Sequence, residues 1–214
     1  MKSDNYINSI NLNQNTSFPY LVLNVINDNS YPRNPGFRVM HWHEDIQFIY
    51  VFEGEIEVVT LDNQFTLHEK EGIFINKNVV HLVNKIQACH YNSFIFPDYF
   101  LRFYVGSPAD EIVSRIIGKE NLPVVKIAYS AENQPVLITL EKLAYLEKHK
   151  TELYQYEVLS TLSSLWLEFC RIVNVAKSES NKKNSHSSDR MTIFLQYIES
   201  HFKEDISLEM LAKS

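Results

Sequence analysis

Cysteine and glycine are both scarce in this sequence. Its 214 residues include two cysteines, Cys89 and Cys170, and five glycines. The cysteines lie far apart and neither belongs to a C-x-x-C motif, which argues against a disulfide framework and against a structural zinc site. No glycine-rich phosphate-binding loop, G-x-S-x-G or H-E-x-x-H motif is found either. The sequence therefore shows none of the usual signatures of nucleophilic or phosphate-binding enzymes.

A membrane span and an excess of basic residues are also missing. No segment approaches the roughly 18 consecutive apolar residues of a transmembrane helix, and the first residues lack the basic-then-apolar order of a signal sequence. Lysine and arginine number 20 against 26 acidic residues, which gives a net charge of −6. Free-standing nucleic-acid binders usually carry a basic stripe. We therefore expect a cytoplasmic protein without membrane contact, whose residues in this sequence do not bind DNA by themselves.

The first hundred residues contain a series of short segments rich in β-branched and aromatic residues. Turn signals such as Asn34-Pro35-Gly36 and Glu53-Gly54 separate them. Many short strands at this spacing are typical of an all-β sandwich or a closed barrel. One segment, 46–52, is apolar on both faces and should be covered on both sides. The expected strands are 20–26, 37–41, 46–52, 55–61, 64–68, 72–76 and 92–96.

The segment from Ala131 to Ala176 predicts two helices. The second helix has two apolar stripes, so it needs two partners. Residues 135–149 supply one partner as an antiparallel helix, and the other is either the barrel or the same helix of a second subunit. We expect a homodimer, although a helix wedged within one chain would show the same pattern. The stripe expected at the dimer interface has heptad spacing and consists of Leu162, Leu165, Phe169 and Ile172.

Residues 177–189 are polar, rich in serine, asparagine and lysine, and have no periodicity, which predicts a linker. Ordered structure is expected again in residues 190–214. Ser207 can cap a second helix there, with Glu209 in its first turn, where the helix dipole favours a carboxylate. A piece of this size is too small to be a stable domain alone, so we expect the sequence to end partway into its second domain. One face of the first helix carries Met191, Phe194, Leu195, Ile198 and Phe202.

Four segments in this order carry a family pattern: "HWHEDIQFIYVFEGEIEV", "FTLHEKEGIFINKNVVHLV", "CHYNSFIFPDYF" and "IFLQYIESHFKEDISLEMLAKS". Together they resemble the AraC/XylS family of bacterial transcription regulators over residues 20–214. No single motif is specific, but their order and spacing together are.

The resemblance implies a mostly β and then α fold. It comprises a cupin-like double-stranded β-helix barrel at 1–130, an antiparallel helical pair for dimerisation at 131–176, a linker at 177–189 and the truncated start of an all-α helix-turn-helix domain at 190–214. It further implies a small-molecule effector and DNA binding through recognition helices that lie beyond this sequence.

His41 and His43 match the spacing of the first cupin motif, with three residues between His43 and Gln47 and six between Gln47 and Gly54. Residues 41 and 43 of a strand point to the same face, so their side chains can converge. Enzymes of the cupin type carry a glutamate at the position of Gln47. The second motif is shortened but keeps His81, which a barrel of this kind would place across from His43.

Three interpretations of this cluster stay open. His41, His43, Gln47 and His81 bind a divalent metal, since imidazole suits iron, zinc, copper and nickel, although an amide oxygen is a weak ligand for them. Alternatively, they contact an organic effector, with Phe94 in the apolar wall. Neutral histidine and glutamine both donate and accept hydrogen bonds, which suits hydroxyls, amides or a sugar ring. The third interpretation is that they only pack. We favour effector contacts and no required cofactor.

The expected function is therefore a ligand-responsive transcription regulator rather than an enzyme. The main alternative is a metal-dependent cupin enzyme, such as a dioxygenase or isomerase. A dimerisation scaffold without a ligand is the third possibility. Gln47 and the segment "YIESHFKEDISLEMLAKS" separate these functions, because an enzyme has no evident need for that segment.

Overall fold

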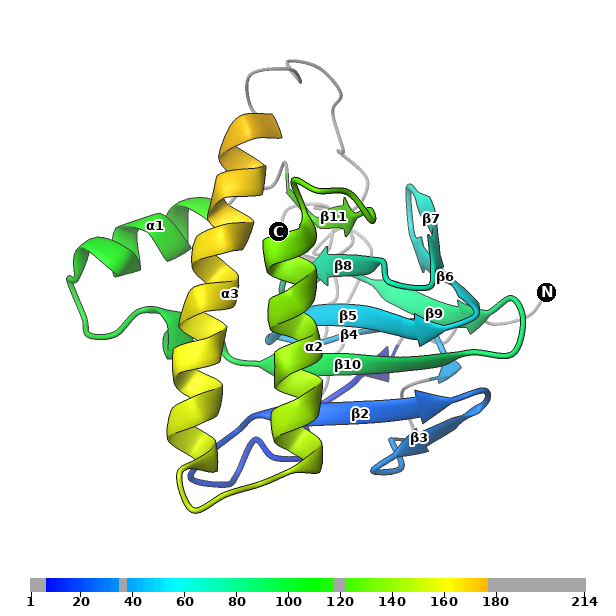
Figure 1. The fold of residues 1–214 in the computed structure, drawn as a ribbon, viewed down its shortest axis with the longest axis horizontal. Coiled ribbons are helices and arrows are strands. Elements are labelled where there is room, and N and C mark those ends of the chain that lie inside the picture. The colour runs from blue at the N-terminus through cyan, green and yellow to red at the C-terminus, as the bar shows by residue number, and fades with distance from the viewer. Residues whose placement is uncertain (1–6, 35–37, 118–121, 177–214) are drawn as a thin grey trace, which may run out of the picture.

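The computed structural model describes residues 7–34, 38–117 and 122–176 (Figure 1). The expected linker at 177–189 and the expected helix-turn-helix start at 190–214 lie outside the described residues. Within them, two β-sheets are followed by a layer of helices. This order agrees with the mostly β and then α fold expected from the sequence.

Two sheets form the barrel. The smaller has the order β1-β4-β9-β6-β7 and the larger β11-β8-β5-β10-β2-β3. Pairing is antiparallel except between β1 and β4. The strands are β1 (Ile7–Asn8), β2 (Leu21–Ile26), β3 (Asn29–Tyr31), β4 (His41–Trp42), β5 (Ile46–Glu53), β6 (Glu55–Thr60), β7 (Gln64–His68), β8 (Gly72–Ile75), β9 (His81–Lys85), β10 (His90–Phe96) and β11 (Val124–Ile127).

The larger sheet is buried on both faces. Along β5, Ile49 and Val51 belong to an apolar cluster between the two sheets, together with Val58 of the smaller sheet. Phe48 and Tyr50 belong to a second cluster, under the helices. Side chains alternate along a strand, so the expectation that 46–52 is covered on both sides is confirmed.

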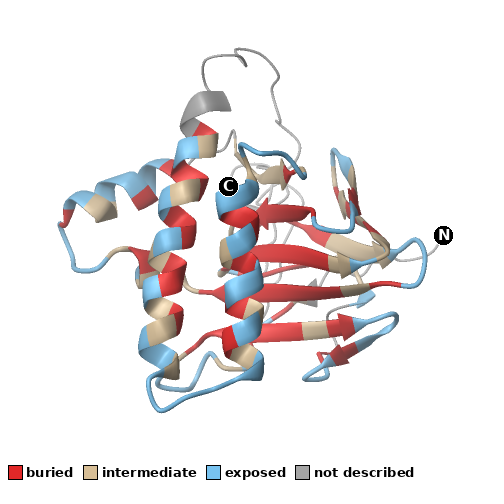
Figure 2. Ribbon diagram, in the orientation of Figure 1, coloured by how far each residue is buried: buried red, intermediate tan, exposed pale blue. Residues whose placement is uncertain are grey.

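The helical layer consists of the 3-10 helix η2 (Asp98–Leu101), α1 (Pro108–Ile117), α2 (Gln134–Lys148) and α3 (Tyr154–Ala176). Helices α2 and α3 cover the outer face of the larger sheet, whereas α1 projects away from the sheet beyond α3 (Figures 1 and 2). The rings of Phe74 and Phe169 lie 4.5 Å apart between sheet and α3. Nothing among the described helices has both the length and the hydropathy that crossing a membrane requires.

The dimer stripe expected on α3 is used within the chain. Leu162, Leu165 and Phe169 are fully buried in the core shared with the larger sheet, and Ile172 packs against that core while partly exposed. The assignment of the first three to a subunit interface is therefore wrong. Their heptad spacing arises because one helix packs against both a sheet and α2, and a sequence pattern does not distinguish this from packing between subunits.

The prediction of a strand at 37–41 is also wrong. Arg38–Met40 pair with no strand, and β4 begins only at His41. The carbonyl oxygen of Val39 instead lies 2.8 Å from Nδ1 of His41. The side chain of His41 thus donates to the carbonyl group of Val39, which in a longer strand would accept from a neighbouring strand. Four further strands, β1, β3, β9 and β11, and the helices η2 and α1 were not expected.

Gly54 offers a test of the turn between β5 and β6. Its φ is +78°, and a Cβ there would lie 1.9 Å from the carbonyl oxygen of Ala88. Gly106 has the same φ of +78° with nothing within 4 Å, so it is a matched control. We expect Gly106→Ala to cost ~1–2 kcal/mol for the left-handed backbone, and Gly54→Ala to cost a further ~1–3 kcal/mol for the clash. Urea unfolding measures both, and equal losses would contradict the close approach.

Candidate functional site

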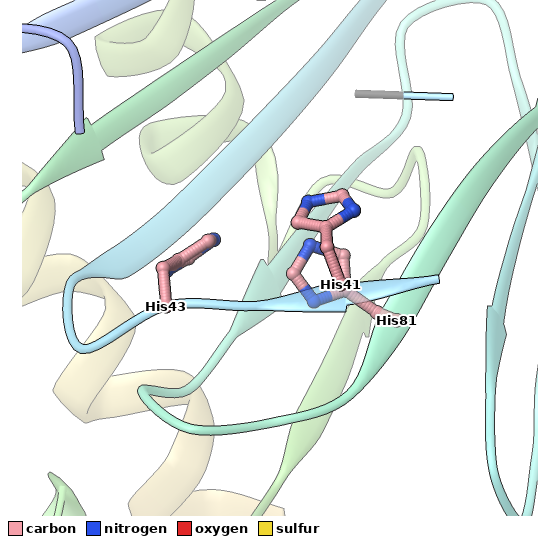
Figure 3. Close-up of side chains that lie close together, drawn as sticks. All are labelled: His41, His43 and His81. Carbon is pink, nitrogen blue, oxygen red and sulfur yellow. The ribbon is translucent and has the colours of Figure 1, made fainter. Parts of the chain in front are cut away.

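Three histidines lie together at one end of the barrel. His41 lies on β4, His43 just after it, and His81 is the first residue of β9 (Figure 3). The ring centroids of His41 and His81 are 4.4 Å apart, and those of His43 and His81 are 5.2 Å apart. In the strand pairing His81 lies opposite His41, rather than His43 as expected. All three side chains are buried, with at most 6% exposed.

A backbone carbonyl fixes the orientation of each of the three rings. Nδ1 lies 2.8 Å from Val39 O in His41, from Asp45 O in His43 and from Val79 O in His81. A carbonyl oxygen only accepts, so each Nδ1 must carry the proton and donate it. In the neutral imidazoles, Nε2 therefore keeps its lone pair. The cluster thus presents three unprotonated nitrogens, which is the form in which histidine binds a metal or accepts a hydrogen bond.

Burial keeps two of these rings neutral. Desolvation, and then the neighbouring His43, lower the pKa of His41 to about 4. Desolvation, followed by His41 and His43, lowers the pKa of His81 well below its ordinary value. An imidazolium ion is poorly solvated in this environment, and a second positive charge nearby repels it. The lone pairs are thus available at neutral pH.

Gln47 joins the cluster from β5. Its Oε1 lies 2.9 Å from Nε2 of His43, and its Nε2 donates to Oγ of Ser93 at 2.6 Å. If Nδ1 of His43 carries the proton, two acceptors face each other across the first of these distances. Exchanging the amide oxygen and nitrogen resolves this, because Gln47 then donates to His43 and accepts from Ser93. A proton or a metal ion between the two atoms resolves it as well.

The cluster also contains a nitrogen without a partner. Nε2 of His81 is buried and makes no hydrogen bond. One ring nitrogen from each of the three histidines lies within 4.8 Å of the others. Imidazole nitrogens on a tetrahedral zinc lie about 3.4 Å apart, from bond lengths of about 2.0–2.1 Å, so the rings would move slightly inward. The donor set therefore fits a divalent metal, held by His41, His43 and His81 with Gln47 beside them.

Phe94 does not belong to this site. It lies on β10 with its side chain in the core beneath the helices, beside Phe48, so its expected place in a ligand-binding wall is wrong. On this strand the inward side chains are Tyr91, Ser93 and Ile95. A strand that is apolar on both faces gives no indication of which parity points inward. Ser93, the partner of Gln47, was missed for the same reason.

Comparison with known proteins agrees with this geometry. Residues 33–87 match the Cupin domain family, and this stretch contains all three histidines and Gln47. The chain is also homologous to the HTH-type transcriptional regulator YdeC of Bacillus subtilis (strain 168), with 27% identity over 183 residues. That alignment covers 84% of this chain and 61% of the relative, so the chain spans less than two thirds of the length of the curated relative it matches.

Two solved structures resemble the chain in part. One is an apo variant of ToxT from Vibrio cholerae strain SCE256, with a TM-score of 0.47, 9% identity, and coverage of 93% of this chain and 70% of that one. The other is the AraC-like transcriptional activator CuxR, with a TM-score of 0.46, 9% identity, and coverage of 79% and 56%.

The opposite end of the barrel has a polar cavity of about 500 Å³. Its lining includes Asp28, Arg38, Lys85 and Tyr91. Asp28 pairs with Arg38 at 3.1 Å and with Lys85 at 2.6 Å. Lys85 ends the strand that begins with His81, so β9 connects the two polar regions, and apolar side chains of the inner cluster lie between them.

Replacing Gln47 tests the metal-binding capacity of the cluster. We expect Gln47→Glu to raise affinity for Ni²⁺ or Zn²⁺ about tenfold or more, because a carboxylate adds a negative charge against the cation and bonds it more strongly than an amide does. Gln47→Leu, which has no ligand atom, is the matched control and should not gain affinity. Competition with a chromophoric chelator gives the constants. Equal affinities for the two variants would exclude residue 47 from any metal site.

Proposed function

We propose that this chain is the effector-sensing and dimerisation part of a ligand-responsive bacterial transcription regulator, active in the cytoplasm and without enzymatic activity. The homology to an HTH-type transcriptional regulator over 183 residues carries this proposal. DNA binding would come from a region beyond the described residues. The homodimer would use surfaces of the helical layer other than the buried face of α3.

The larger sheet supplies a physical connection between sensing and output. Along β5, Gln47 points to the histidine cluster, whereas Phe48 and Tyr50 point to the helices. The hydroxyl of Tyr50 donates to the carboxylate of Glu141 on α2. A ligand that shifts β5 from inside thus also acts on the packing of α2 and α3. An effector that binds one helix arrangement more tightly would favour that arrangement.

A polar organic molecule is the effector that suits the barrel. The cavity beside Arg38 and Lys85 supplies open volume, charges of both signs and the buried side chain of Tyr91. Groups of this kind suit a ligand with several hydroxyl, amide or carboxylate groups. For an effector that penetrates further, His41, His43, Gln47 and His81 are the contacts we propose.

A metal-dependent enzyme is the second candidate, supported by three buried histidines that each place a ring nitrogen within 4.8 Å of the others. A divalent metal held there would supply Lewis-acid or redox chemistry. His41, His43 and His81 would hold it through Nε2, and their Nδ1 bonds to backbone carbonyls would keep the rings oriented. All three side chains are buried, so a substrate, like an effector, would reach them only with movement of the barrel.

Metal analysis combined with thermal melting separates these functions. Melting temperature is measured with and without a chelator and against a panel of sugars and small polar metabolites. For the regulator we expect no stoichiometric metal and a rise in melting temperature with one class of metabolite, since a ligand at 100 times its Kd stabilises by ~2.7 kcal/mol. Stoichiometric metal and destabilisation by the chelator would favour the enzyme, and neither response would leave a dimerisation scaffold.

A pair of variants locates the effector. We expect Arg38→Met to abolish the rise in melting temperature, because it removes a charged wall of the polar cavity. Arg115→Met is the matched control, since Arg115 lies on α1 and pairs only locally with Glu111 at 2.9 Å. A rise that survives Arg38→Met would move the effector away from this end of the barrel.

A further inference from the structure

The polar cavity at the opposite end of the barrel contains a carboxylate between two cations. This carboxylate belongs to Asp28, in the two-residue turn between β2 and β3. Its Oδ1 lies 3.1 Å from Nη2 of Arg38, and its Oδ2 lies 2.6 Å from Nζ of Lys85. Arg38 precedes β4 and Lys85 ends β9, so three separate segments meet at one carboxylate. The arrangement is the one expected for a bound anion.

The Asp28 side chain is not enclosed in this place. Its exposed fraction is 46%, and those of Arg38 and Lys85 are 63% and 34%. The hydrogen bond with Lys85 lowers the pKa of Asp28, and the charge of Arg38 acts in the same direction. Asp28 is therefore ionised at neutral pH, but exposed ion pairs of this kind contribute little to stability. Its side chain can turn into solvent when another carboxylate competes for the two cations.

The turn itself is anchored independently of this side chain. The backbone N–H of Asn27 donates to the carbonyl oxygen of Cys89 at 2.8 Å. The N–H of Cys89 in turn donates to Oδ1 of Asn27 at 3.2 Å. Departure of the Asp28 carboxylate from Arg38 and Lys85 would therefore leave the backbone of the turn in place.

The space beside the ion pairs is large enough for a small molecule. Its volume is about 500 Å³, within the range of about 300–1,000 Å³ found for small-molecule sites. Tyr91 belongs to the lining and is 3% exposed. Its hydroxyl has no hydrogen-bond partner among the described residues, yet it is not one of the polar atoms closed off from solvent. The hydroxyl is therefore accessible to a second polar group of a ligand.

The charges of the lining favour one class of anion. Arg38 and Lys85 are positive, and Asp28 and Glu57 are negative. Once Asp28 has left, the remaining three charges sum to one positive charge. A singly charged carboxylate balances that charge, whereas a doubly charged phosphate exceeds it and is repelled by Glu57. A carboxylate also matches the planar guanidinium of Arg38.

We propose that the effector is a small organic carboxylate whose charged group takes the place of the Asp28 side chain between Arg38 and Lys85. Asp28 is then an internal competitor, which pairs with both cations in the absence of the effector and leaves when the effector binds. This inference rests on the effector site proposed above, and it adds the class of ligand and the exchange that admits it. A neutral sugar has no group that replaces the charge of Asp28.

Rescue by acetate tests this exchange, because acetate carries the same carboxylate as an aspartate side chain. The melting temperature of the 214-residue Asp28→Ala variant is measured against acetate, with chloride keeping the ionic strength constant. We expect a saturable rise. The apparent affinity for acetate should be about threefold to thirtyfold above that of the wild type, since two exposed ion pairs no longer compete. Acetamide, which is neutral and of nearly the same shape, should cause no rise.

Two further variants are the controls. Glu111→Ala removes a carboxylate from the exposed ion pair with Arg115, at 2.9 Å on α1, and should show no rise specific to acetate. Adding Arg38→Met to Asp28→Ala should abolish the rescue. Absence of a rise in Asp28→Ala, an equal rise in Glu111→Ala or an equal rise with acetamide would overturn the proposal. Tighter binding of inorganic phosphate than of acetate would overturn the assignment to a carboxylate.

The metabolite panel distinguishes failure of this inference from failure of the proposed function. A neutral metabolite that stabilises the wild type but not Arg38→Met would overturn the carboxylate and keep the effector site. A carboxylate metabolite that binds Asp28→Ala more tightly than it binds the wild type would support both.

Discussion

The burial of the larger sheet on both faces is the constraint on which the rest of this structure depends. Strand β5 places Ile49 in the core between the sheets and Phe48 in the core under the helices. Each strand of the sheet centre thus belongs to two cores at once. Because such interiors are close-packed and deform little, a displacement on one face is felt on the other. The same constraint accounts for the burial of the apolar face of α3 within the chain.

The histidine cluster shows how a buried polar site is kept in one state. Each ring donates through Nδ1 to a backbone carbonyl, and burial then lowers the pKa of His41 and His81. Burial favours the neutral rings, and the Nδ1 bonds place the lone pair of each neutral ring on Nε2. This state serves metal binding and hydrogen bonding to an organic ligand equally, and Gln47 shifts the balance away from the metal, because it brings an amide rather than a negative charge.

Much of the fold could be predicted because local pattern and global packing agree. Strands β2, β5, β6, β7, β8 and β10 and helices α2 and α3 follow from alternation, turn residues and helical periodicity. Two of the missed strands are short or weakly patterned: β9 reads "HLVNK", and β11 pairs only with β8 at the edge of its sheet. Their conformation depends on the neighbours they pair with, and the sequence does not reveal those neighbours.

For the site, the sequence by itself determined that His41, His43, Gln47 and His81 belong to one cluster. The spacing of the motifs indicates this even where single residues differ from the motif. Only the tertiary structure decided that Phe94 points away from this cluster, that Ser93 supports Gln47, and that Leu162, Leu165 and Phe169 pack inside the chain. The physical reason is that an apolar residue in the sequence predicts burial of its side chain, but does not predict which surface the side chain packs against. That choice is made by contacts between segments far apart in the chain.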